Sequence, residues 1–301
     1  MAASRPRAVV EQDVRPPGPY RLPPAGRDGL MRRRGSALTR LLHHEGEPAL
    51  VHAWALPSAV RLRAAAPSRA TALAALERMR FGLGLDHDLR SFHRRFRRDP
   101  LLGPVIRCLP WLRPVRRPEP FEALAWAITE QLIESGRAAA VQRRLVMRYG
   151  RPSPCATLRD APSAAALAAR APAELEACDL SAGRSVALVR AAREVAAGRV
   201  DLAAAEPYCR RLHAIRGIGA WTLECLALYG QGRDEVLPAG DLAYLKLVGR
   251  LEGLGRRATE EEVRRFFAPY ASHAGLAGTY ALRCRVGGVN HPGRGRAGGR
   301  W

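Results

Sequence analysis

The segment with the clearest chemical potential is a glycine-containing turn between two short apolar runs, in residues 212–230 (LHAIRGIGAWTLECLALYG). Glycine lets a backbone approach a ligand closely, and the first N–H groups of a following helix, with its dipole, attract an anion. The spacing therefore predicts a helix–hairpin–helix whose backbone clamps a phosphate at Gly217, Ile218, Gly219 and Ala220. An ordinary corner between two helices would show the same G-x-G, so the turn alone leaves both interpretations open.

Two further motifs flank this hairpin. PFEALAWAITEQLIE (residues 120–134) carries Gln131-Leu132 near its end, and LPAGDLAYLK places Asp241 twenty residues after Trp221. With the string I-x-G-I-G-x-W-T, these motifs resemble the helix-hairpin-helix (HhH-GPD) DNA glycosylase superfamily, in particular the AlkA-type 3-methyladenine DNA glycosylase II branch. The resemblance spans roughly residues 85–285.

Asp241 matches the catalytic aspartate of that family. Cleavage of an N-glycosidic bond builds positive charge on the deoxyribose, so a carboxylate near the anomeric carbon stabilises the transition state and can orient water. An Asp before an apolar helix is also typical of an N-cap. The two roles are compatible.

The resemblance also assigns residues to base flipping. It implies that Leu132, beside Gln131, is a wedge that fills the gap left by a flipped base. The alternative is a core leucine, because Leu124 and Ile128 lie on the same helical stripe. Glu130 adds negative charge close to where DNA should pass.

A base pocket is expected around Trp221, whose indole face suits a base made cationic by alkylation. A buried core tryptophan is the competing interpretation. Cys225 stands where the family often has a tyrosine, Tyr280 substitutes for a late aromatic residue, and Trp126 is included in the expected pocket.

No redox or metal cofactor is expected. The resemblance implies only a structural Na⁺ or K⁺ in the hairpin, held by the backbone carbonyls of His213, Ile215 and Ile218. The six cysteines form no C-x-x-C pair, which favours reduced, mostly buried thiols. The His43-His44 pair is interpreted as part of a solvated turn, because no second pair at metal-ligand spacing accompanies it.

Charge indicates the partner. The 301 residues contain 49 Lys+Arg against 28 Asp+Glu, a net charge of +21, which favours a polyanion such as duplex DNA with damaged bases. No segment has the apolar length of a membrane span, and residues 1–13 carry acidic residues where a secretory signal needs an apolar run, so a cytoplasmic location is expected. A monomer is also expected. Lys246 is the only lysine, and Trp221 occupies the position of the lysine with which bifunctional family members form a Schiff base. No AP-lyase activity is therefore expected.

The elements that must position these residues indicate an α+β fold: a small mixed N-terminal domain, then a two-part all-helical domain. Residues 1–18 are expected to be a disordered basic tail, residues 19–80 the N-terminal domain, residues 81–285 the helical domain and residues 286–301 a Gly/Arg-rich tail. Alternation over residues 49–65 predicts a β-hairpin, and residues 28–44 carry helix-like spacing.

Helices are predicted over residues 121–134, 137–149, 206–214 and 220–229, with further helices starting at Ser181, at Asp241 and at the capping box of Thr259, and a last helix over 279–285.

The sequence thus predicts a monofunctional DNA glycosylase that excises alkylated purines from duplex DNA. Two alternatives remain open. One is a non-catalytic helix-hairpin-helix protein that binds damaged or branched DNA, and the other is a glycosylase for uracil or an oxidised base.

Overall fold

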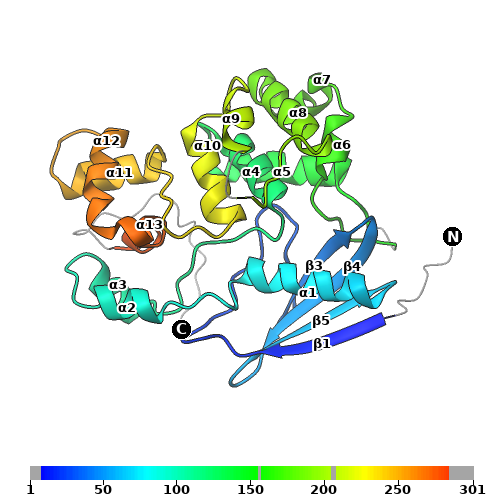
Figure 1. The fold of residues 1–301 in the computed structure, drawn as a ribbon, viewed down its shortest axis with the longest axis horizontal. Helices are drawn as coiled ribbons and strands as arrows, with labels where there is room; N and C mark the ends of the chain where they lie inside the picture. Colours follow the sequence, from blue (N-terminus) through cyan, green and yellow to red (C-terminus); the bar gives the residue numbers. More distant parts are fainter. Residues whose placement is uncertain (1–7, 155–156, 205–207, 285–301) are drawn as a thin grey trace.

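The computed structural model describes residues 8–154, 157–204 and 208–284. An antiparallel sheet with one covering helix is followed by two groups of helices (Figure 1). The α+β class and the two-part helical domain expected from the sequence are both present. The predicted tail of residues 286–301 lies outside the described residues, as does Cys155.

The sheet has the strand order β1-β5-β4-β3-β2. Its strands are β1 (Ala8–Val14), β2 (Arg32–Arg34), β3 (Ala37–His44), β4 (Glu47–Ala55) and β5 (Val60–Ala66), and all neighbours pair antiparallel. The predicted hairpin corresponds to β4 and β5. In β5 the buried Val60, Leu62 and Ala64 alternate with arginines, and the buried face packs against helix α1 (Arg69–Leu83).

Two sequence predictions are wrong in this region. Residues 8–14 are not part of a tail but form the edge strand β1, held to β5 partly by two hydrogen bonds from Arg61 to Asp13, of 2.6 and 2.7 Å. The N-terminal unit therefore begins before residue 19. Residues 28–44 are not helical: they contain β2 and β3. Leu38, Leu41 and Leu42 repeat at helical spacing because both faces of β3 are buried, which removes the alternation that identifies a strand.

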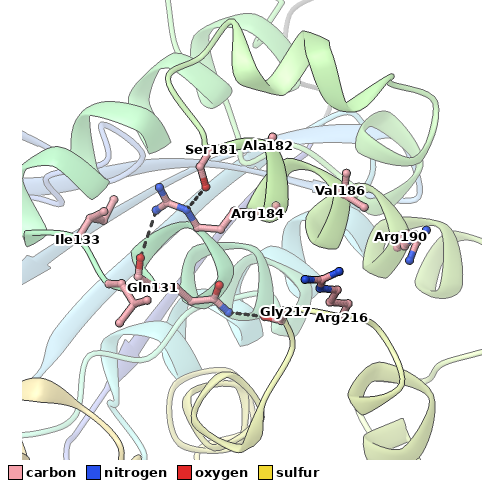
Figure 2. Close-up of a pocket in the computed structure, with 11 residues that line it drawn as sticks. Gln131, Ile133, Ser181, Ala182, Arg184, Val186, Arg190, Arg216 and Gly217 are labelled. Carbon is pink, nitrogen blue, oxygen red and sulfur yellow. Dashed lines mark hydrogen bonds between the residues drawn. The ribbon is translucent and has the colours of Figure 1, made fainter.

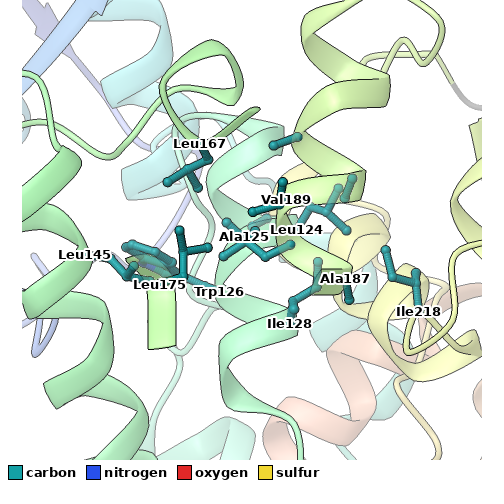
Figure 3. Packing of buried hydrophobic residues seen from close by; sticks show 14 of the residues in the cluster. Leu124, Ala125, Trp126, Ile128, Leu145, Leu167, Leu175, Ala187, Val189 and Ile218 are labelled. Atoms are coloured by element: carbon teal, nitrogen blue, oxygen red, sulfur yellow. The ribbon is translucent and has the colours of Figure 1, made fainter. Parts of the chain in front are cut away.

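The first helical lobe surrounds α4, which runs through its centre (Figure 3). Its helices are α4 (Pro120–Glu130), α5 (Ser135–Tyr149), α6 (Ala164–Ala168), α7 (Pro172–Glu176), α8 (Ala182–Ala196), α9 (Tyr208–His213), α10 (Ala220–Cys225) and the π-helix η1 (Leu226–Gly230). Leu124 and Ile128 of α4 meet Ala187 and Val189 of α8 in this core, and Ile218 joins them from the hairpin.

The second lobe has its own apolar core. It is built from α2 (Arg90–Phe96), α3 (Leu102–Cys108), α11 (Leu242–Leu251), α12 (Glu260–Phe267), the 3-10 helix η2 (Ala268–His273) and α13 (Ala274–Ala281). The capping box at Thr259 is formed as predicted. The last helix comprises residues 274–281 rather than 279–285. None of the helices described is long and apolar enough to cross a membrane.

Buried charges join the sheet to the first helical lobe. Arg40 of β3 forms an ion pair with Glu122 of α4, and both side chains are almost completely buried. Asp28 accepts hydrogen bonds from Arg117 at 2.7 Å and from the indole N–H of Trp126 at 3.0 Å. Such pairs fix a register but cost desolvation, so losing one partner is strongly destabilising.

His43 belongs to the same interface. The prediction of a solvated turn is wrong for this residue, because the helical lobe covers the end of β3 and buries it. Its Nδ1 lies 3.2 Å from a carboxylate oxygen of Asp160.

Candidate active site

The hairpin between α9 and α10 presents an open backbone. Gly217 has φ +94°, a left-handed conformation that favours glycine, and Gly219 is the extended N-cap of α10. A Cβ added at Gly219 would meet no heavy atom of the described residues within 4 Å, apart from its neighbours in the chain. Ile218 is buried in the core and anchors the turn from beneath. The first N–H groups of α10 are therefore available to an anion.

A second turn, at the end of α4, carries Leu132. This residue has a relative exposure of 105% and a left-handed φ of +55°. Its stripe partners Leu124 and Ile128 are fully buried. The interpretation of Leu132 as a core leucine is therefore wrong. The helix ends at Glu130, before the stripe would reach Leu132.

Gln131 connects the two turns. Its side-chain nitrogen donates to the Gly217 carbonyl at 2.7 Å and to the Thr222 hydroxyl at 2.9 Å. Between the turns and α8 lies a groove of about 720 Å³, lined by Leu132, by the start of α8 and by the hairpin (Figure 2).

Three arginines line this groove: Arg184, Arg190 and Arg216. Arg190 and Arg216 are exposed, and neither forms an ion pair with any residue in the described ranges. Sequence reasoning did not single out these side chains. The sequence does contain one indication of their importance. Arg184 lies in the first turn of a helix, where the helix dipole usually favours acidic residues.

Asp241 is the N-cap of α11. Its carboxylate accepts the Ala243 N–H at 2.7 Å, and the side chain is half-buried. The loop before it lies against Trp221, because a Cβ added at Gly240 would be 3.7 Å from that of the tryptophan. The capping interpretation is therefore right for Asp241, and the remaining carboxylate oxygen is not committed to the cap.

The first helical lobe places a second carboxyl group near Asp241. Burial raises the pKa of Glu130, and the charges of Asp241 and Asp28 add to this effect, whereas a 2.9 Å hydrogen bond from Gln142 opposes it. Burial also raises the pKa of the Cys225 thiol well above its ordinary value, with further contributions from Asp241 and Glu130. Cys225 therefore stays a neutral thiol beside two carboxyl groups.

Trp221 is half-buried, and its indole N–H is buried without a hydrogen-bond acceptor among the described residues. Its Cβ would lie 3.7 Å from a Cβ added at Gly240, which places it close to the loop before Asp241.

The structure places the other two expected pocket aromatics in the cores. Trp126 is 2% exposed and donates to Asp28, on the side of α4 that meets the sheet. Tyr280 is 0% exposed, with its ring against Phe92 and its hydroxyl 2.9 Å from His93 Nε2. Their assignment to an open pocket is wrong. An aromatic residue type does not by itself show whether its face of the helix is buried by neighbouring elements or open to a ligand.

The carbonyls expected to hold a monovalent cation belong to the turn that ends α9. The Ile215 carbonyl accepts the Ile218 N–H at 2.9 Å, which leaves a second lone pair for a cation. The cation site stays a prediction. Among the described residues there is no group of three or more His, Cys, Asp or Glu side chains that could hold a metal ion.

A comparison of the sequence with known protein families identifies the superfamily that this chain resembles. A model of the HhH-GPD superfamily of base excision DNA repair proteins matches residues 125–271, which include the hairpin, Asp241 and every residue that lines the groove. Over residues 125–271 the chain is therefore similar to this superfamily. The match begins inside α4, so the sheet domain lies outside it.

Two curated superfamily relatives are similar to this chain. The DNA-3-methyladenine glycosylase of Bacillus subtilis (strain 168) is 25% identical over 209 residues, which cover 66% of this chain and 68% of the relative. The DNA-3-methyladenine glycosylase 1 of Schizosaccharomyces pombe is 29% identical over 140 residues, which cover 44% of this chain and 57% of the relative.

Solved structures show the same fold. The 3-methyladenine DNA-glycosylase from Archaeoglobus fulgidus superposes with a TM-score of 0.72 at 20% identity, covering 84% of this chain and 88% of that one. The apo form of Clostridium acetobutylicum 8-oxoguanine glycosylase/lyase gives 0.67 at 16% identity, with coverages of 86% and 90%. At these identities the likeness extends to the fold alone.

Proposed function

We propose that this protein is a monofunctional DNA glycosylase of base excision repair, which excises alkylated purines of the 3-methyladenine type from duplex DNA. The observation that carries the proposal is the exposed Leu132, hydrogen-bonded through its neighbour Gln131 to the hairpin at Gly217. A base-flipping enzyme needs both a phosphate anchor and an apolar wedge, and the hydrogen bond from Gln131 to Gly217 supports assigning these roles to the hairpin and to Leu132. The names of the two curated relatives support the substrate class.

In the proposed mechanism the hairpin binds a backbone phosphate through the N–H groups that begin α10. Leu132 enters the duplex and offsets part of the cost of unstacking the target base. The flipped base stacks on Trp221, whose indole face attracts the positive charge of an alkylated purine.

Asp241 performs the chemical step. As the bond between the sugar and the base breaks, its carboxylate stabilises the oxocarbenium charge and orients a water molecule toward the anomeric carbon. Water forms the new C–O bond and gives up a proton to the Asp241 carboxylate, while the base departs with the electrons of the broken C–N bond. An alkylated purine is already cationic, so it leaves as a neutral base without prior protonation.

The test is incubation of the purified protein with methylated duplex DNA, followed by chromatography of the released bases. Release of 3-methyladenine by wild type, abolished in Asp241→Asn, is the expected result. Tight binding without release would favour the non-catalytic DNA-binding alternative. Release only from duplexes containing uracil or 8-oxoguanine would overturn the substrate class and leave the glycosylase activity standing.

A further inference from the structure

We propose that Arg184 is a positioning residue that holds the turn at Leu132 in its extruded conformation before DNA binds. This inference rests on the proposed function, because the turn matters only if Leu132 enters the duplex. If the turn is already ordered in the folded protein, the conformational entropy of Leu132 is lost on folding and not when DNA binds.

Among the residues that the structure describes, Arg184 forms three side-chain hydrogen bonds, of which Figure 2 draws those to Ser181 and Gln131. Its Nη1 donates to the carbonyl oxygens of Thr129 at 3.0 Å and Gln131 at 3.3 Å, and its Nε donates to the Ser181 hydroxyl at 2.8 Å. The guanidinium therefore joins the start of α8 to the two residues on either side of Glu130. The planar fork of arginine suits such a bridge because one rigid group serves several acceptors.

Electrostatics favour the same role. The last carbonyls of a helix lack intrahelical donors and carry partial negative charge. The last turn of α4 contains no basic residue of its own, and Arg184 supplies the missing cation from α8. Within the described residues its side chain forms no ion pair, so these carbonyls are its main acceptors.

Leu132 needs support of this kind. A non-glycine residue with positive φ is strained, and the fully exposed Leu132 side chain has little packing to hold it there. The turn is instead fixed from two sides, by Arg184 and by the hydrogen bonds that Gln131 donates to the hairpin.

Arg190 provides a matched control. It lies on the same helix and lines the same groove, but it forms no hydrogen bond with the turn in the described structure. Arg184→Gln and Arg190→Gln each remove one positive charge from the groove. Only Arg184→Gln removes the bridge to Thr129 and Gln131.

The experiment compares single-turnover excision from two duplexes, one with the target base paired and one with an abasic site opposite it. Displacing the target is cheaper in the second duplex, so a disordered wedge should matter less there. Arg184→Gln is expected to slow excision from the paired duplex about tenfold more than from the other, whereas Arg190→Gln should slow both alike. Ser181→Ala, which removes only the Nε partner, should give a smaller change in the same direction.

Amide hydrogen exchange of residues 131–136 gives a readout without DNA. It should accelerate in Arg184→Gln and stay at the wild-type rate in Arg190→Gln, with unchanged exchange in α8. Equal slowing on both duplexes by Arg184→Gln, or unchanged exchange in the turn, would overturn the positioning role. If wild type released no base at all, the proposed function would fail, and the exchange comparison would still decide whether Arg184 orders the turn.

Discussion

The side-chain amide of Gln131 donates to the main-chain carbonyl of Gly217 at 2.7 Å. This bond links the turn that exposes Leu132 to the hairpin whose backbone faces the proposed phosphate. The same amide also donates to the Thr222 hydroxyl in the first turn of α10, so under the proposed function a phosphate bound at the hairpin would set the position of Leu132. In the proposed function this bond would couple DNA anchoring to base displacement.

Asp241→Asn should separate catalysis from binding. The amide oxygen of Asn can still accept the Ala243 N–H, so the cap and the fold are retained. The charge that meets the oxocarbenium ion is lost, and single-turnover excision should fall about 100-fold or more. Affinity for undamaged duplex, measured by fluorescence anisotropy, should stay within about twofold. A mutant rate equal to that of wild type would remove Asp241 from the mechanism.

Leu132→Ala should slow excision without destabilising the protein, because a side chain that is 105% exposed contributes no core packing. Ile128→Ala, one turn earlier and fully buried, is the contrasting variant and should cost about 2–5 kcal/mol of unfolding free energy. Thermal melts and single-turnover rates on the same preparations test both statements. A large fall in the melting temperature of Leu132→Ala would contradict the exposed wedge.

The sequence predicted most of the helical domain and the backbone of the hairpin well, because their signals are local. Proline at the start of α4, the capping box at Thr259 and the glycines of the hairpin each determine the backbone within a few residues. The N-terminal unit was predicted less well. Its strand β3 is buried on both faces, so the leucines at positions 38, 41 and 42 have the spacing of a helix. Strand β1 forms only because it pairs with β5, a strand nearly fifty residues away, and no local pattern indicates that pairing.

The candidate site shows the same difference between features set by local sequence and features set by contacts between distant segments. The position of Asp241 at the start of a helix follows from its neighbours, but the burial of Tyr280 and Trp126 depends on which elements cover them, which no local pattern contains. The proposed role of Arg184 could not be predicted from local sequence either, because its acceptors lie on α4 and the following turn, more than fifty residues earlier.

Gly219→Glu should weaken DNA binding irrespective of base sequence. A Cβ at this position meets no heavy atom of the described residues within 4 Å, so the fold should tolerate the substitution, but glutamate would place a negative charge where a phosphate is proposed to approach the start of α10. For wild type, log K against log[salt] should fall with a slope of about −0.9 per neutralised phosphate. Anisotropy titrations over a range of salt concentrations check both points, and a flat salt response would exclude a phosphate-dominated interface.

Glu130→Gln should change how stability depends on pH. Burial raises the pKa of Glu130 above its ordinary 4.5, so between pH 4.5 and the raised value the folded protein holds a proton that the unfolded chain has released. The free energy of unfolding contributed by this group therefore falls as the pH rises through that window. Urea unfolding at a series of pH values should show a smaller decline for Glu130→Gln than for wild type, while Glu176→Gln, at an exposed position on α7, should follow wild type. Superimposable curves for Glu130→Gln and wild type would count against the buried acid.

Borohydride treatment of a reaction between the protein and damaged DNA should trap no covalent complex. A lyase step requires an amine that forms an imine with the sugar, and the hairpin position at which bifunctional superfamily members carry a lysine is Trp221, whose indole cannot do so. Lys246 is the only lysine, and it lies on the exposed side of α11, five residues beyond Asp241. Five residues at about 100° each turn its side chain roughly 140° away from the direction of Asp241. Electrophoresis after borohydride should show free protein and an intact strand bearing an abasic site, which alkali then cleaves. A trapped adduct that disappears in Lys246→Ala would show that α11 presents this amine to the sugar and that the enzyme is bifunctional.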